Sequence, residues 1–176
     1  TGGMTAAAFA NMSTTQFIQT MGPIAQADYK KSGVLASVTL AQAILESGWG
    51  KSELAQKGNN LFGMKTNLSG NTWSGSVWDG YSSVTINTGE EYGGKHVTIS
   101  APFRKYSCVE QSVADHSAYL VNAKDGYSYR YAGLTSTNSY KKQLTIIKNG
   151  GYATSSTYVS QLTSLIERYN LDQYDR

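Results

Sequence analysis

The amino-acid sequence predicts an α+β fold, in which a mostly helical lobe and a small β-hairpin lobe flank a groove. Apolar residues recur at helical spacing before residue 58 and again after residue 107. Between these regions, from Gly58 to Arg104, glycines separate short stretches in which apolar and polar residues alternate, a pattern typical of strands. A length of 176 residues suits one domain. We expect that domain to occupy residues 13–176.

The N-terminal segment, residues 1–12, consists mostly of small side chains without a helical or strand-like repeat of apolar residues. We expect it to be a tail or linker. Ser13 or Thr14 can cap the first helix, in which apolar residues recur from Phe17 to Ile24. Gly22-Pro23 interrupts this pattern, because proline lacks the amide N–H that a helix uses. The sequence therefore predicts two helical pieces here.

The central helix is predicted over Val34 to Glu46. It is apolar on most sides, so it should be buried in the helical lobe. Gly48 and Gly50 provide the glycines that a helix end needs. A further short helix is expected from Lys51 to Lys57, ended by Gly58.

Two alternating stretches, Val84 to Ile86 and Val97 to Ile99, predict a β-hairpin. The residues between them include several glycines, so we expect a long and pliable tip. Helices are then expected to resume, with a capping box at Ser107 to Glu110, a helix over Ser139 to Lys148 and a last helix over Tyr158 to Tyr169.

The composition narrows the class of protein. Charged residues make up 15% of the chain and the net charge is +3, without a long run of Lys or Arg, which argues against nucleic-acid binding. The chain contains no apolar stretch long enough to cross a bilayer, so we expect no membrane insertion. A single cysteine excludes an internal disulfide framework.

The sequence offers few candidates for metal binding or for nucleophilic catalysis, so carboxylates are the main candidates for catalysis. His96 and His116 lie 20 positions apart, and neither has a second ligand at zinc spacing, so we expect no metal and no cofactor. Cys108 and His116 would stand about 12 Å apart along one helix, too far for proton transfer. We therefore interpret Cys108 as a small buried thiol and His116 as an imidazole on a helix surface. We interpret Asp115, on the same helix, as a surface charge or a cap.

Two carboxylates remain as candidates. Glu46 ends an apolar helix, where the helix dipole and partial desolvation disfavour the anion, and a carboxyl that keeps its proton can act as a general acid. From placement alone, a carboxylate that simply emerges into solvent is an equally good interpretation. Glu90 lies in the glycine-rich hairpin, where it should be ionised and could pair with the acid across a groove. Without further support, an ordinary solubilising charge on a loop is the better interpretation of Glu90.

Aromatic residues suggest what the groove could bind. The chain has 13 tyrosines, several of which lie in or near loops after residue 120, and Trp73, Trp78 and Tyr81 lie in the β region. Sugars stack on such rings, and their hydroxyls bond to neighbouring polar side chains. The alternative is that several of these rings fill the core.

Six short blocks, in order, resemble the bacterial N-acetylglucosaminidases of glycoside hydrolase family 73, which include autolysins and flagellar peptidoglycan hydrolases. Each block is weak alone, and their shared order over roughly residues 14–170 is the strong signal. The blocks are residues 43–50 (AILESGWG), 59–65 (NNLFGMK), 88–90 (TGE), 103–106 (FRKY), 129–131 (YRY) and 151–154 (GYAT).

The resemblance implies a lysozyme-like fold and cleavage of the β-1,4 bond that follows N-acetylglucosamine in peptidoglycan glycan strands. It implies Glu46 as the general acid and Glu90 as the second carboxylate, with Glu91 as the alternative because the sequence reads Glu-Glu-Tyr at this place. Ser155 stands where the family usually has aspartate, which we interpret as a lost loop contact. The residues implied to contact substrate are Asn60, Phe62, Tyr131 and Tyr152.

The same resemblance leads us to expect a secreted, wall-associated monomer. Two other functions stay open at this stage. A lytic transglycosylase would need only one acid on the same fold, and a wall-binding module would use the groove without turnover.

Overall fold

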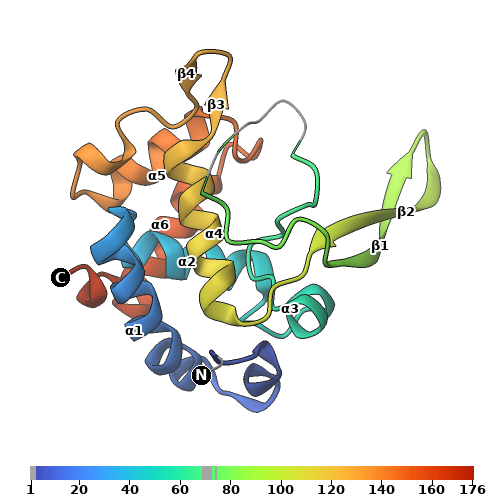
Figure 1. Cartoon of the computed structure of the whole chain (residues 1–176), viewed down its shortest axis with the longest axis horizontal. Coiled ribbons are helices and arrows are strands. Elements are labelled where there is room, and N and C mark those ends of the chain that lie inside the picture. The colour runs from blue at the N-terminus through green and yellow to red at the C-terminus, as the bar shows by residue number, and fades with distance from the viewer. Residues whose placement is uncertain (1–2, 69–72, 74) are drawn as a thin grey trace.

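The computed structural model describes residues 3–68, 73 and 75–176, with the backbone alone for residues 88–92. It confirms the α+β fold: the helices form one lobe, and a long hairpin projects away from it (Figure 1). The helices are η1 (Ala6–Asn11), α1 (Thr14–Ser32), α2 (Ala36–Ser47), α3 (Glu53–Gly58), α4 (Val109–Asn122), η2 (Leu134–Ser136), α5 (Tyr140–Asn149), α6 (Tyr158–Tyr169) and η3 (Leu171–Tyr174). The strands are β1 (Ser83–Tyr92), β2 (Lys95–Arg104), β3 (Lys124–Asp125) and β4 (Ser128–Tyr129).

The segment before Ser13 is packed against the helical lobe, in contrast to the expected tail. Phe9 in η1 is 0% exposed, and its ring centroid lies 4.8 Å from that of Phe17. The amide of Ala6 donates to Oδ1 of Asn59 at 2.8 Å. Sequence pattern missed this packing because η1 is a single short helix that contributes only two buried side chains.

Helix α1 runs unbroken through Pro23, so the expected split into two helical pieces is wrong. It begins at the expected cap, where Ser13 and Gln16 form a capping box, and it ends at Gly33 in the left-handed conformation. Gly22 lies against the ring of Tyr174 from η3, where a Cβ atom would come within 2.2 Å of the ring. This glycine therefore serves the packing of α1 on the C-terminal segment.

Helix α2 is the buried central helix that the sequence predicts. Every residue from Ala36 to Ile44 is buried, and Gly48 ends the helix with φ of 55°. Its N-terminus has no cap of its own, because Leu35 occupies the N-cap position. Instead, the carboxylate of Asp175 accepts hydrogen bonds from the amide and hydroxyl of Ser37, at 2.8 and 2.6 Å.

The hairpin is confirmed, but its tip is short. The strands pair from Ser83 with Arg104 to Tyr92 with Lys95, which leaves only Gly93 and Gly94 in the turn. Both glycines have positive φ, 57° and 81°, as a tight two-residue hairpin turn requires. The glycines that suggested a pliable loop therefore allow a sharp reversal between two long strands.

The start of α4 also differs from the expected capping box. Cys108 is the N-cap residue and its side chain makes no cap hydrogen bond. The carboxylate of Glu110 accepts a hydrogen bond from the amide of Met4 instead, at 3.1 Å. Over the described part of the chain, none of the helices combines the length and the apolar character needed to cross a membrane.

Candidate active site

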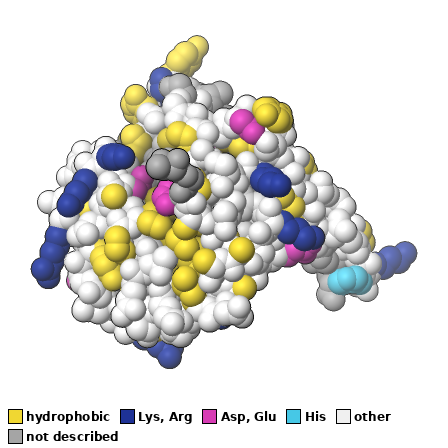
Figure 2. Space-filling view, turned by 60° about the horizontal axis from the view of Figure 1, so that its bottom comes forward, with side chains coloured by type: hydrophobic (Ala, Val, Ile, Leu, Met, Phe, Trp, Pro, Cys, Tyr) yellow, Lys and Arg dark blue, Asp and Glu magenta, His cyan; other side chains and the backbone are white. Residues whose placement is uncertain are grey.

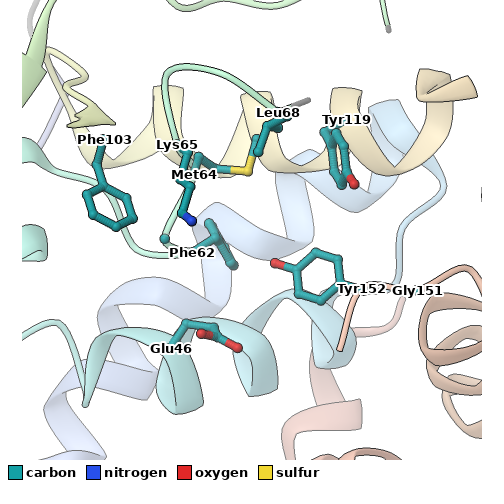
Figure 3. A pocket seen from close by; sticks show the side chains of 10 residues that line it. Glu46, Phe62, Met64, Lys65, Leu68, Phe103, Tyr119, Gly151 and Tyr152 are labelled. Carbon is teal, nitrogen blue, oxygen red and sulfur yellow. The ribbon is translucent and has the colours of Figure 1, made fainter. Parts of the chain in front are cut away.

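A cavity of about 450 Å³ lies where the C-terminal end of α2 meets the 62–68 loop, helix α4 and the 151–152 turn. Its volume is within the range of small-ligand sites. Figure 3 shows the side chains that face into it. The lining residues are Glu46, Phe62, Gly63, Met64, Lys65, Leu68, Phe103, Tyr119, Gly151 and Tyr152.

Glu46 lies in the last turn of α2, and its carboxyl points into this cavity (Figure 3). The residue is reached by solvent, yet the neighbouring side chains exclude enough water to raise the pKa of its carboxyl above the ordinary value. Figure 2 shows acidic side chains among a gathering of hydrophobic side chains on one face of the molecule. A carboxyl of raised pKa in such a setting suits a proton donor.

Phe62 lies opposite Glu46 and is held from behind by His116. The two rings stack with centroids 3.8 Å apart and planes 12° apart. His116 is 0% exposed, so the expected surface position is wrong, and burial lowers the pKa of its imidazole to about 3. The imidazole is therefore neutral at ordinary pH and cannot serve as a general base.

Tyr152 forms another wall of the cavity, with its hydroxyl directed inward (Figure 3). Its ring meets His116 edge-on at 6.1 Å. Burial raises the pKa of the phenol well above its usual value, and the charge of the nearby Glu46 adds to this effect. The hydroxyl therefore stays protonated and can donate a hydrogen bond to a sugar oxygen.

Asn60 does not line the cavity, in contrast to the position implied by the resemblance. It is 1% exposed, and its side-chain oxygen Oδ1 accepts hydrogen bonds from the backbone N–H groups of Phe62 and Met64. It donates to the carbonyls of Met64 and Arg104, both at 2.9 Å. These bonds occupy its hydrogen-bonding capacity, so Asn60 shapes the loop that carries Phe62.

Tyr131 also lies behind the cavity wall. It is 3% exposed, and its hydroxyl is 3.1 Å from that of Tyr119, which does line the cavity. Tyr131 therefore supports Tyr119. Tyr119, on α4, is 7% exposed and belongs to the hydrophobic core, and it also lines the cavity.

A buried ion pair supports the same region. Nη1 of Arg104, at the end of β2, lies 3.0 Å from Oδ2 of Asp115 on α4, and the hydroxyl of Tyr106 donates to the same carboxylate oxygen. The guanidinium of Arg104 lies over the rings of Trp73 and Trp78, with its Cζ atom 4.5 and 4.6 Å from the two ring centroids. Asp115 had been expected at the surface, which is wrong, because its charge is balanced by an arginine that only the fold brings near.

Glu90 lies far along the hairpin from the cavity. Phe103, which lines the cavity, pairs with Val84, and Glu90 pairs with Val97 nearer the tip. The six residue-to-residue steps from Val84 to Glu90 span about 20 Å along the strand. The side chains of Glu90 and Glu91 lie outside the described residues, so the choice between them stays a prediction.

Among the described residues, no group of three His, Cys, Asp or Glu side chains is placed to hold a metal ion. The cavity instead presents one carboxyl of raised pKa, one protonated phenol, the lysine Lys65 and several apolar or aromatic surfaces. These groups can deliver a proton and bind ring-shaped ligands.

A carboxyl at the floor of a groove between a helical lobe and a hairpin is the arrangement of a glycoside hydrolase domain. The chain belongs to the glucosaminidase family, because the family model "Mannosyl-glycoprotein endo-beta-N-acetylglucosaminidase" matches residues 22–171. This match confirms the family expected from the sequence motifs.

Similar proteins agree with this family. Exo-glucosaminidase LytG of Bacillus subtilis is 41% identical over 159 residues, which cover 90% of this chain and 52% of that protein. Peptidoglycan hydrolase FlgJ of Pseudomonas aeruginosa is 37% identical over 164 residues, covering 89% of this chain and 38% of that protein. The chain thus spans about half, or less, of the length of these relatives.

Solved structures confirm the lysozyme-like fold. The catalytic domain of the autolysin Auto from Listeria monocytogenes superposes with a TM-score of 0.74 at 36% identity, covering 96% of this chain and 92% of that one. The glycoside hydrolase domain of FlgJ from Salmonella typhimurium gives a TM-score of 0.67 at 30% identity, covering 90% and 98%.

Proposed function

We propose that this protein is a peptidoglycan hydrolase, an endo-β-N-acetylglucosaminidase that cleaves the β-1,4 bond between N-acetylglucosamine and N-acetylmuramic acid. The observation that carries the proposal is the position of Glu46 at the floor of the cavity, with a raised pKa. Glu46 protonates the oxygen that leaves, while Phe62 and Tyr152 hold the sugar on either side.

Glu90 serves as the second carboxylate in this mechanism, acting on water or on the positive charge that develops at the sugar. Because it lies about 20 Å along the hairpin from the level of the cavity wall, the hairpin must move toward the helical lobe before Glu90 can act. Figure 1 shows the hairpin projecting away from that lobe. Movement of this kind is common in enzymes that close over substrate.

The relatives point to an extracellular substrate. They include a protein named autolysin from Enterococcus faecalis, 36% identical over 167 residues. We infer that this protein acts on the cell wall after secretion, and that it acts as a monomer, since one chain supplies both carboxylates.

A lytic transglycosylase is the second candidate, because among the side chains that the structure describes a single carboxyl, that of Glu46, lines the cavity. Another relative is named a probable N-acetylmuramidase, at 34% identity, so the bond that is cleaved needs a direct test. Purified peptidoglycan would be digested and its products identified by mass spectrometry. Reducing N-acetylglucosamine ends support the proposal, whereas anhydro-muramic ends or reducing muramic ends contradict it. A non-catalytic wall-binding module would sediment with peptidoglycan and release no sugar.

A further inference from the structure

The cavity around Glu46 contains one cationic side chain, that of Lys65. Of the 10 residues that line it, only Glu46 and Lys65 carry a charge. Figure 3 shows the Lys65 side chain extending into the cavity between Phe103 and Phe62. Among the described residues that line this wall, Lys65 therefore provides the positive charge that an entering ligand would meet.

The backbone of Lys65 is fixed by the network behind it. Its carbonyl accepts a hydrogen bond from Nε of Arg104 at 2.9 Å, and the residue forms an isolated bridge with Phe103 on β2. Arg104 is in turn held by its buried ion pair with Asp115. The base of the lysine side chain is thus held in place, while its flexible stem lets the ammonium adjust to a ligand.

Lys65 has no carboxylate partner among the side chains that the structure describes, in which the ion pairs join other residues. The ammonium is therefore available to a group that enters the cavity from outside.

We propose that Lys65 binds a carboxylate of the substrate and so makes the protein prefer muramic-acid glycans over neutral glycans. This inference rests on the proposed function and adds a specificity residue to it. N-acetylglucosamine is uncharged, whereas each N-acetylmuramic acid carries a lactyl group. Its carboxylate is either free or joined to a stem peptide that brings carboxylates of its own. Lys65 binds this carboxylate, whether it belongs to the lactyl group or to the stem peptide.

Binding measurements separate these sources. The full chain carrying Glu46→Gln, which prevents turnover, would be titrated by calorimetry with three soluble ligands. They are chitin oligosaccharides, muramic-acid glycan fragments with stem peptides, and the same fragments after the stems are removed by an amidase. The Lys65→Met substitution would be added to the same background, since methionine keeps most of the apolar stem and removes the charge.

We expect Lys65→Met to weaken binding of carboxylate-bearing fragments about tenfold, the size expected of one charge-assisted contact, and to leave chitin binding unchanged. Added salt should reduce the wild-type preference. A loss confined to fragments with stems assigns the contact to peptide carboxylates, and a loss that persists after stem removal assigns it to the lactyl group. Lys105→Met is the matched control, because Lys105 is exposed, lies next to Arg104 and does not line the cavity.

Equal weakening for all three ligands would overturn the inference, because Lys65 would then act through the cavity or the hairpin. Unchanged binding of all three would overturn it as well. These outcomes are distinct from a failure of the proposed function, which would appear as a wild-type chain that binds the fragments and releases no reducing N-acetylglucosamine.

Discussion

The imidazole of His116 lies flat against the ring of Phe62, with centroids 3.8 Å apart, directly behind the wall of the cavity. Both nitrogens of this imidazole are buried and have no hydrogen-bond partner among the described residues. A neutral imidazole can tolerate this setting far better than a charged one, because burial of an unpaired charge is costly. Protonation of His116 would therefore destabilise the cavity wall that contains Phe62.

His116 should make folding sensitive to acid. Its folded pKa is lowered from 6.5 to about 3, so between these values the unfolded chain binds a proton that the folded chain does not. The free energy of unfolding then falls as pH falls through this window, by up to about 1.4 kcal/mol per pH unit from this group. His116→Phe, which keeps a stacking ring, should remove that contribution. Urea unfolding at pH 6.5, 5.5 and 4.5 measures it, and parallel curves for both proteins would contradict the prediction.

Glu46→Gln should lower the rate of peptidoglycan cleavage by about 10²- to 10⁴-fold, the usual contribution of a general acid, with the fold unchanged. In the wild type, activity should fall as pH rises through the pKa of Glu46, because the acid must be protonated. Since that pKa is raised, this fall should occur above the ordinary value of 4.5. Glycan release and circular dichroism measure the two effects. Glu53→Gln is a suitable control, since Glu53 is exposed and pairs with Lys57.

Glu90→Gln and Glu91→Gln distinguish the second carboxylate. We expect Glu90→Gln to impair cleavage severely, and Glu91→Gln to retain most activity, because the family resemblance implies Glu90 as the second carboxylate. Initial rates of glycan cleavage would be compared at matched protein concentration. An active Glu90→Gln together with an inactive Glu91→Gln would transfer the role to Glu91.

Asp175→Ala should destabilise the chain by about 0.5–2 kcal/mol, the cost of a lost helix cap, because Asp175 supplies the cap that α2 lacks. Chemical denaturation of Asp175→Ala, Ser37→Ala and the double variant would give the coupling between the two residues. Asp172→Ala serves as the control, since Asp172 is exposed. Strictly additive losses would show that the contact contributes nothing.

The sequence was sufficient for features that depend on neighbouring residues. Helical spacing located α2, α5 and α6, and alternation located the two long strands, because the repeat of each element is written in consecutive positions. It was also sufficient for the family and for Glu46 as the leading candidate, since the motif around Glu46 is a continuous stretch. The glycine-rich turn was placed correctly but its length was not, because pairing across the strands decides where a hairpin ends.

The errors over Asp115 and Gly22 share one physical cause, which is contact between residues of separate elements that a local sequence pattern does not reveal. Asp115 reads as a surface charge until Arg104, at the base of the hairpin, neutralises it. Likewise Gly22 reads as a helix break until Tyr174 packs against it.

By itself, then, the sequence determined the elements, the family and the identity of the candidate acid, because local pattern and continuous motifs carry that information. Only the tertiary structure decided which side chains face the cavity and which support it from behind. It alone showed that Lys65 lines the same cavity as Glu46. The reason is that burial, charge pairing and hydrogen-bond satisfaction are properties of the assembled chain, and each depends on residues that meet only after folding.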